Sequence, residues 1–159
     1  MIFYLFRHGQ TYFSKNHLQY KDKNDTAEIL KEGIYQIKDI ANKLKSEGIK
    51  QIYSSPIKRC VQTVNIVQKE VPNIKVDFDQ RIKEQEVTTG GETFDDQTKR
   101  IKDFLDEIKN KDYEKVGICS HGWPIAVMIR LLKGKKVHRI NLIKYPKCGK
   151  IIIIDSKLT

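Results

Sequence analysis

Short apolar runs alternate with longer amphipathic stretches along this chain, and the alternation limits the folds open to it. Each apolar run has the length of a buried strand, and the four clearest are residues 2–6, 51–53, 74–78 and 115–119. The stretches between them carry apolar side chains at the spacing of a helix with one buried face, at 30–47, after 56, at 94–109 and at 124–133. This order predicts an α/β fold: a three-layer α/β/α sandwich around a mostly parallel sheet.

Local signals refine this outline at three places. Ser55 followed by Pro56 is the pattern of a helix N-cap with proline at the first helical position. Residues 12–28 are polar and irregular, so we expect a loop there. Residues 140–145 and 151–154 are predicted to be two strands joined as a hairpin.

The chain has the length of one domain. It holds 159 residues, and no repeat or flexible linker divides it, so we predict a single domain over residues 1–159. We expect no membrane span, because the longest mostly apolar stretch, 116–132, contains His121 and Arg130. We expect a cytoplasmic protein, since no export signal is present and the cysteines form neither a disulfide framework nor a zinc pattern.

Positive charge is concentrated late in the sequence. The formal net charge is +10, and residues 115–150 contain basic residues but no acidic ones. A positive field of this kind attracts anions, whether phosphorylated substrates, nucleic acid or acidic proteins. The charge alone is also explained by a solvated lysine-rich surface, so we do not expect nucleic acid as a partner.

Several common phosphate-handling motifs are absent. No cysteine is followed at the sixth position by arginine, which excludes the loop of cysteine-dependent phosphatases. The P-loop pattern, the G-x-G-x-x-G fingerprint and the G-x-S-x-G serine elbow are missing as well.

Two histidines instead follow predicted strands. His8 comes directly after the first strand, and His121 after the fourth, just before a predicted helix. Ligands in parallel α/β sheets lie beyond the carboxyl ends of the strands, so both side chains are expected at one site. Arg7 precedes the first histidine, and Arg59 lies in the first turn of another helix, where free backbone N–H groups favour anions. The alternative for each histidine is a purely structural role; a metal site is not expected, because no third ligand stands at a suitable spacing.

These residues give the chain its resemblance to the histidine phosphatase superfamily, also called the phosphoglycerate mutase-like family. The motif R-H-G-[EQ]-T stands at 7–11, near the N-terminus as in the family. The further motifs follow in family order, as an L-x-x-G-x-x-Q segment at 30–36, S-S-x-x-x-R-x-x-Q-T at 54–63, an R-L-x-E-like segment at 81–84, G-G-E-[ST] at 90–93 and S-H-G at 120–122.

The resemblance implies a phosphoglycerate mutase-like fold and a phosphatase of the histidine acid phosphatase type, a phosphoric monoester hydrolase that uses no metal or cofactor. His8 would attack phosphorus and form a phosphohistidine intermediate, which requires a neutral imidazole. Glu84 would act as general acid and base. The groups that would neutralise the phosphoryl oxygens are Arg7, Arg59 and His121, and the further residues that would bind substrate are Gly9, Gln10, Thr11, Ser14 and Gly122.

The sequence departs from the family pattern at three places. Ser14 stands where the family often has asparagine, and Gln10 replaces the commoner glutamate. Only five residues separate Glu84 from Gly90, where relatives usually carry an insertion that roofs the pocket. Glu86 is close enough to be the acid in place of Glu84.

We therefore expect a phosphatase with an open site, acting on a phosphorylated small molecule or on a phosphoprotein, including protein phosphohistidine. Mutase activity is the alternative. The short spacer argues against it, because a mutase needs a closed pocket that retains its substrate. A second alternative is a non-catalytic scaffold that binds RNA or another anion through residues 115–150. The oligomeric state is not predicted.

Overall fold

The computed structural model describes residues 1–85, 91–139 and 145–157, and one five-stranded sheet organises them. The strands are β1 (Ile2–Arg7), β2 (Gln51–Ser54), β3 (Lys75–Phe78), β4 (Lys115–Ser120) and β5 (Ile151–Asp155). They lie in the order β3-β2-β4-β1-β5. The first four are parallel, and β5 pairs antiparallel with β1 at the edge.

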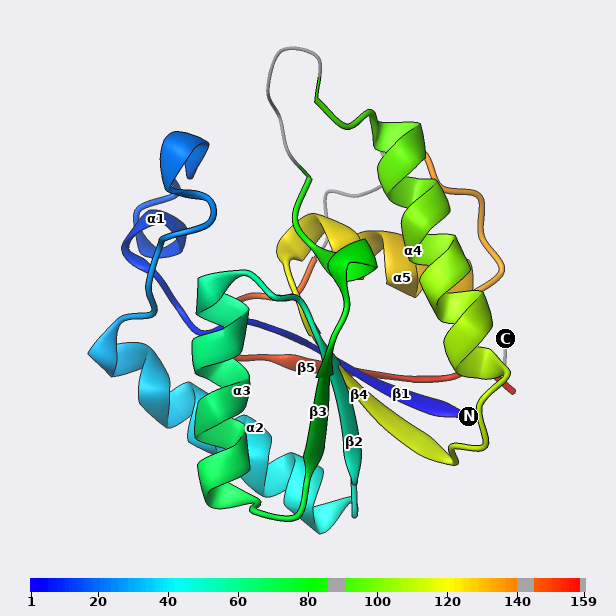
Figure 1. Cartoon of the computed structure of the whole chain (residues 1–159), viewed down its shortest axis with the longest axis horizontal. Coiled ribbons are helices and arrows are strands. Elements are labelled where there is room, and N and C mark those ends of the chain that lie inside the picture. The colour runs from blue at the N-terminus through cyan, green and yellow to red at the C-terminus, as the bar shows by residue number, and fades with distance from the viewer. Residues whose placement is uncertain (86–90, 140–144, 158–159) are drawn as a thin grey trace.

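Helices cover both faces of this sheet, as predicted (Figure 1). The helices α2 (Ile34–Ser46) and α3 (Lys58–Glu70) pack side by side on one face. The helices α4 (Phe94–Lys109) and α5 (Gly122–Leu132) pack against each other on the other face. Shorter helices precede these in the loops, as α1 (Tyr12–Lys15), η1 (Lys21–Lys23), η2 (Lys31–Gly33) and η3 (Gln80–Ile82).

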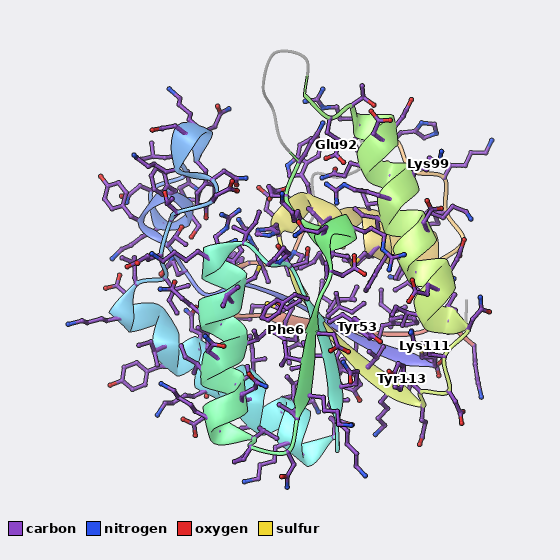
Figure 2. All side chains as sticks on the ribbon, viewed as in Figure 1. Phe6, Tyr53, Glu92, Lys99, Lys111 and Tyr113 are labelled. Carbon is purple, nitrogen blue, oxygen red and sulfur yellow. The ribbon has the colours of Figure 1, made fainter. Side chains whose placement is uncertain are left out.

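The alternation of side chains along β1 separates two apolar clusters, one on each face of the sheet. Phe3 and Leu5 belong to the cluster beneath α4 and α5, whereas Tyr4 and Phe6 belong to the cluster beneath α2 and α3. Figure 2 shows side chains filling the space between the sheet and the helices, with Lys99 and Lys111 on the outside.

Most predicted elements are confirmed, and the helix starts are the main corrections. The segment 30–47 begins with the short helix η2 before α2 starts at Ile34. Helix α3 begins at Lys58, with Ile57 and not Ser55 at the N-cap position. Helix α5 begins at Gly122, two residues before the predicted start.

Two predictions concern irregular or partly described segments. The loop predicted over residues 12–28 contains α1 and η1. The strand predicted at 140–145 lies largely outside the described residues, which leaves the hairpin untested. Its expected partner is present as β5, which pairs with β1.

Candidate active site

The carboxyl ends of β1 and β4 bring the two motif histidines together, as their strand-end positions predict. Arg7 pairs with Ser120 in the parallel register, and the N–H of His8 donates to the carbonyl of Ser120 at 3.1 Å. The chain turns off the sheet at this point on both strands. The imidazole rings of His8 and His121 are both buried, with centroids 5.3 Å apart.

Hydrogen bonds fix the proton on His8. Nδ1 lies 2.8 Å from the carbonyl oxygen of Gly9, which accepts only, so Nδ1 carries the hydrogen. The lone pair of the neutral ring is then on Nε2, and Nε of Arg59 donates to it at 3.2 Å. Burial, followed by the positive charges of Arg59 and Arg7, holds the pKa of His8 well below its ordinary value of 6.5. A neutral imidazole with its lone pair on Nε2 is the form that can act as a nucleophile.

Arg59 reaches this lone pair from the start of α3 and is itself fully buried. Its guanidinium donates to the main-chain carbonyl and, at 3.0 Å, to Oδ1 of Asn24. The ring of Tyr20 lies against the guanidinium, 4.1 Å from centroid to Cζ. The planar group is thus held in one orientation by three contacts, which lysine could not reproduce.

His121 faces the serine that was predicted to cap α3. Its Nε2 lies 2.8 Å from Oγ of Ser55, and Sγ of Cys60 lies 3.5 Å from the same atom. The Ser55 hydroxyl thus contacts a site residue, and it also accepts from the N–H of Ile57 at 3.3 Å. Nδ1 of His121 is buried and has no partner. Burial and the charge of Arg59 keep the pKa of His121 well below 6.5.

Glu84 is a carboxyl group that interacts with the charges of these arginines. Burial raises its pKa above the usual value of 4.5, while the positive charges of Arg59, Arg7 and Arg100 oppose the rise. Its Oε1 accepts from the N–H of Gln85 at 3.3 Å. The other candidate acid, Glu86, lies outside the described residues.

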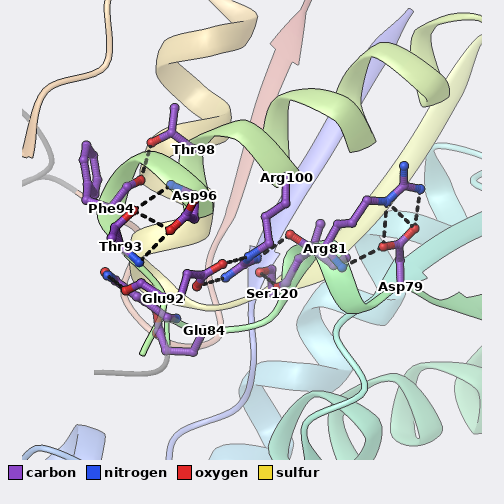
Figure 3. A network of polar contacts seen from close by, with 12 residues as sticks. Asp79, Arg81, Glu84, Glu92, Thr93, Phe94, Asp96, Thr98, Arg100 and Ser120 are labelled. Carbon is purple, nitrogen blue, oxygen red and sulfur yellow. Dashed lines mark hydrogen bonds and ion pairs between the residues drawn. The ribbon is translucent and has the colours of Figure 1, made fainter. Parts of the chain in front are cut away.

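The segment that carries Glu84 is fixed to α4 and β4 (Figure 3). Arg100 donates to the carbonyl of Arg81 and pairs through both Nε and Nη2 with the carboxylate of Glu92. Oγ of Ser120 donates to the carbonyl of Ile82 at 2.6 Å. Arg100 therefore joins the chain before Glu84 to the chain that leads into α4.

A cavity of about 880 Å³ opens in front of these groups. Arg7 and Glu84 both line it, and so do Tyr20 and Asn24, the two residues that hold Arg59. Nε of Arg7 is buried and has no hydrogen-bond partner among the described residues, so the guanidinium has donor capacity for a ligand. Of the five residues expected to be catalytic, Arg7 and Glu84 line the cavity directly. Arg59 contacts the lining residues Tyr20 and Asn24, and it also contacts His8.

The family model of the histidine phosphatase superfamily (branch 1) matches this chain over residues 3–89 and 85–156. The chain belongs to this superfamily. No curated protein sequence matches the chain closely enough to count as a relative.

Solved structures of other proteins share the fold of this superfamily member. A putative alpha-ribazole-5'-P phosphatase from Escherichia coli has a TM-score of 0.84 at 17% identity, over 98% of this chain and 90% of that one. YhfR of Bacillus stearothermophilus has a TM-score of 0.83 at 17% identity, covering 97% and 90% of the two chains. A mycobacterial glucosyl-3-phosphoglycerate phosphatase has a TM-score of 0.82 at 17% identity, with 97% and 90% covered.

The substrate-binding residues expected from the superfamily motif are placed around the site, but several polar groups are already engaged. The N–H of Gly9 donates to Oγ1 of Thr63 at 2.9 Å. Thr11 and Ser14 bond reciprocally as the capping box of α1. These residues therefore shape the loop after His8 and do not present those groups to a ligand.

The remaining two expected substrate-binding residues, Gln10 and Gly122, follow the ends of β1 and β4. Gln10 accepts through its main-chain carbonyl from the N–H of Leu30 at 2.7 Å. Gly122 opens α5, where the first N–H groups have no partner within the helix and are suited to bind an anion. A Cβ at Gly122 would lie 2.8 Å from the ring of Tyr145, so a side chain there would require that ring to move.

Four contact residues of the histidine phosphatase site were not predicted from sequence: Tyr20, Asn24, Ser55 in this role, and Arg100. Tyr20 and Asn24 stand in the irregular segment 12–28, which has no periodicity to mark them. Arg100 is one of only six arginines in a lysine-rich chain, and that scarcity is the one signal that could have singled it out.

The described residues contain no group of three or more His, Cys, Asp or Glu side chains that could hold a metal ion. Within those same ranges, no helix is long and apolar enough to cross a membrane.

Proposed function

We propose that this histidine phosphatase superfamily member hydrolyses phosphomonoesters, or protein phosphohistidine, through a phosphohistidine intermediate on His8. The observation that carries the proposal is the state of that ring: Nδ1 is bonded to Gly9, Nε2 accepts from Arg59, and the preceding residue, Arg7, lines the cavity. A purely structural histidine has no need of an Nε2 lone pair held by a buried guanidinium group.

The first step is an in-line attack. Nε2 of His8 forms a bond to phosphorus while the bond from phosphorus to the leaving oxygen breaks. Arg59 transfers its hydrogen bond from Nε2 to a phosphoryl oxygen, and Arg7, with its unpartnered Nε, binds another. His121 and the N-terminus of α5 complete the set of donors. Fixed donors of this kind stabilise the charge spread over the equatorial oxygens.

Glu84 supplies the proton in this step. Its raised pKa favours the protonated carboxyl, which donates to the leaving oxygen and becomes a carboxylate. The carboxylate then takes a proton from water as that water attacks the phosphohistidine. The phosphorus–nitrogen bond breaks, inorganic phosphate leaves, and His8 and Glu84 return to their starting states.

The two arginines supply the positive charge for this reaction, so we propose no metal and no cofactor. A cytoplasmic location is part of the proposal and is supported by the free thiols of Cys60, Cys119 and Cys148. A phosphorylated small molecule or a phosphoprotein is the proposed partner.

The test is hydrolysis of p-nitrophenyl phosphate between pH 4 and pH 8 with EDTA present, comparing wild type with His8→Ala and with His17→Ala, an exposed histidine. We expect activity that survives EDTA, is lost in His8→Ala and is retained in His17→Ala. Quenching in alkaline denaturant should trap phosphate on the wild-type chain, in a form labile to acid and stable to base. Equal activity in wild type and His8→Ala would refute the proposal. Salt-sensitive RNA binding without hydrolysis would favour the scaffold alternative.

A further inference from the structure

The cavity beyond the catalytic groups is larger than a phosphate needs. Its volume of about 880 Å³ is in the range of pockets that bury drug-sized ligands, roughly 300–1,000 Å³. The part of the cavity beyond Arg7 and Glu84 is therefore available to the leaving group.

The walls of this part include aromatic and apolar side chains beside polar ones. Leu18 and Tyr20 line it from the segment before η1, while Trp123 and Tyr145 line it from the start of α5 and the segment before β5. Leu18 and Tyr145 expose 49% and 41% of their surface, although both are large apolar side chains. Flat apolar surfaces on two walls favour a ring that packs between them.

Two of these rings lie against the arginines that we propose to bind phosphate. The guanidinium of Arg7 lies 5.2 Å from the centroid of Tyr145, and that of Arg59 lies 4.1 Å from the centroid of Tyr20. A ring held by these walls is thus next to the groups that hold phosphate.

The charges along the described lining balance. Outside the catalytic end with Arg7 and Glu84, Lys21 and Arg139 are offset by Asp22 and Asp25. A leaving group with its own phosphate or carboxylate would need an excess of positive charge here, as the catalytic end provides for phosphate. The balanced charge favours a leaving group without charge.

We propose that this site selects small phosphomonoesters whose leaving group is an uncharged aromatic ring system, in preference to sugar phosphates, phosphorylated acids or phosphoproteins. This proposal rests on the proposed function, because it names the substrate class of the same site. Trp123 is the specificity-determining residue. Its indole packs edge-to-face on Phe94 at 6.3 Å, which holds the ring in place at the cavity wall.

The experiment compares esters of primary alcohols, so that the chemical reactivity of the leaving group is matched. The substrates are 2-naphthylmethyl phosphate, cyclohexylmethyl phosphate, glycerol 3-phosphate and glucose 6-phosphate, with a phosphohistidine-containing protein as a fifth. We expect kcat/KM for the naphthyl ester to exceed that for glycerol 3-phosphate by about tenfold or more, with the cyclohexyl ester between them.

Variants locate the preference in the cavity wall. Trp123→Leu keeps an apolar side chain and removes the flat ring, and it should lower kcat/KM for the naphthyl ester about fivefold while leaving glycerol 3-phosphate within about twofold. Tyr35→Leu is the matched control, since Tyr35 is 76% exposed on α2 and is not part of the lining. It should change neither value.

The outcomes separate this proposal from the one on which it rests. Equal or faster turnover of glycerol 3-phosphate, glucose 6-phosphate or the phosphoprotein would overturn the aromatic preference and leave the phosphatase intact. Hydrolysis of none of the five would refute the proposed function. In that case, equilibrium binding of 2-naphthylmethylphosphonate and of methylphosphonate would still test the aromatic preference. Tighter binding of the naphthyl compound that is weakened by Trp123→Leu would support the preference, and equal binding of the two compounds would overturn it.

Discussion

Nε of Arg59 donates a hydrogen bond to Nε2 of His8 over 3.2 Å, so the guanidinium covers the lone pair that we propose as the nucleophile. The same bond explains two properties of the histidine. It orients the ring from one side while Gly9 holds the other side, and the adjacent charge keeps the ring neutral. A phosphate that enters the site takes over the donor and frees the nucleophile.

Replacement of Arg59 by lysine should lower kcat/KM by a factor of about 10² to 10³, because an ammonium group cannot contact both His8 and Asn24 and still bind a phosphoryl oxygen. Steady-state kinetics with p-nitrophenyl phosphate measure the loss. Lys58→Ala is the control, since Lys58 precedes Arg59 in α3 and pairs with Glu28 on the surface. Activity of Arg59→Lys within threefold of wild type would contradict a bidentate role.

Asn24 is a positioning residue, and Asn24→Ala should lower kcat about tenfold with a smaller change in KM. The main-chain contact to Arg59 remains in this variant, which limits the loss. Asn24→Asp keeps an acceptor for Nη2 and should restore most of the rate. The control is Asn16→Ala, whose amide bonds only to the carbonyl of Tyr12 on the surface. A merely structural role would lower the melting temperature in both Asn24 variants and would show no recovery with aspartate.

The pH dependence should follow His8 and Glu84. His8 must be neutral, and its pKa lies below 6.5, so the acid limb of the pH profile should lie below pH 6.5. Glu84 must be protonated, and its pKa lies above 4.5, so the basic limb of the profile should lie above pH 4.5. We expect kcat/KM to be highest on the acid side of neutral.

The variant Glu84→Gln separates the two limbs. It should lose about 10² to 10⁴ in kcat and should lack the basic limb, because no carboxyl remains to ionise. The ratio of wild-type to variant rates at each pH cancels the ionisation of the substrate. A ratio that does not change with pH would exclude Glu84 and direct attention to Glu86.

Arg100 should set both the position and the pKa of Glu84. Arg100→Gln removes a positive charge near the carboxyl and releases the carbonyl of Arg81, so kcat should fall about tenfold and the basic limb should move to higher pH. Lys102→Gln on the same helix is the control, since its partner is Asp106 on the surface. A loss of rate with an unmoved basic limb would assign Arg100 a structural role only.

The buried neutral histidines should make the fold sensitive to acid. An unfolded histidine takes up a proton near pH 6.5, whereas His8 and His121 stay neutral until lower pH, so the free energy of unfolding should fall as pH decreases below 6.5. Each contributes a slope of up to about 1.4 kcal/mol per pH unit. Urea titrations at pH 5, 6 and 7 measure it.

Two variants test whether His121 causes this dependence of the unfolding free energy on pH. His121→Gln should make it shallower, and His17→Gln should leave it unchanged, because His17 is exposed. An unaltered slope in His121→Gln would mean that this ring is protonated in the folded protein.

The sequence predicted the elements that carry the candidate site better than it predicted the residues that position Arg59 and His121. Helix α4 has the predicted bounds, because its apolar spacing is regular over its whole length. The adjacency of His8 and His121 follows from the rule that parallel strands end at one edge. The predicted start of α3 was wrong, because a serine before proline is also the pattern of a helix N-cap. Only the folded chain shows that the Ser55 hydroxyl contacts His121 instead. The contacts of Tyr20 and Asn24 to Arg59 join an irregular segment to a distant helix, and no local pattern encodes such a pairing.

The two apolar clusters on opposite faces of the sheet have a consequence for the chain before it is fully folded. Arg59 comes from the layer built on α2 and α3, whereas His121 starts α5, and the segment of Glu84 is fastened to α4. A molecule in which only one layer has formed lacks part of the proposed catalytic set. Under the proposed function, nascent or locally opened chains are therefore inactive, and turnover requires that both helical layers have packed on the sheet.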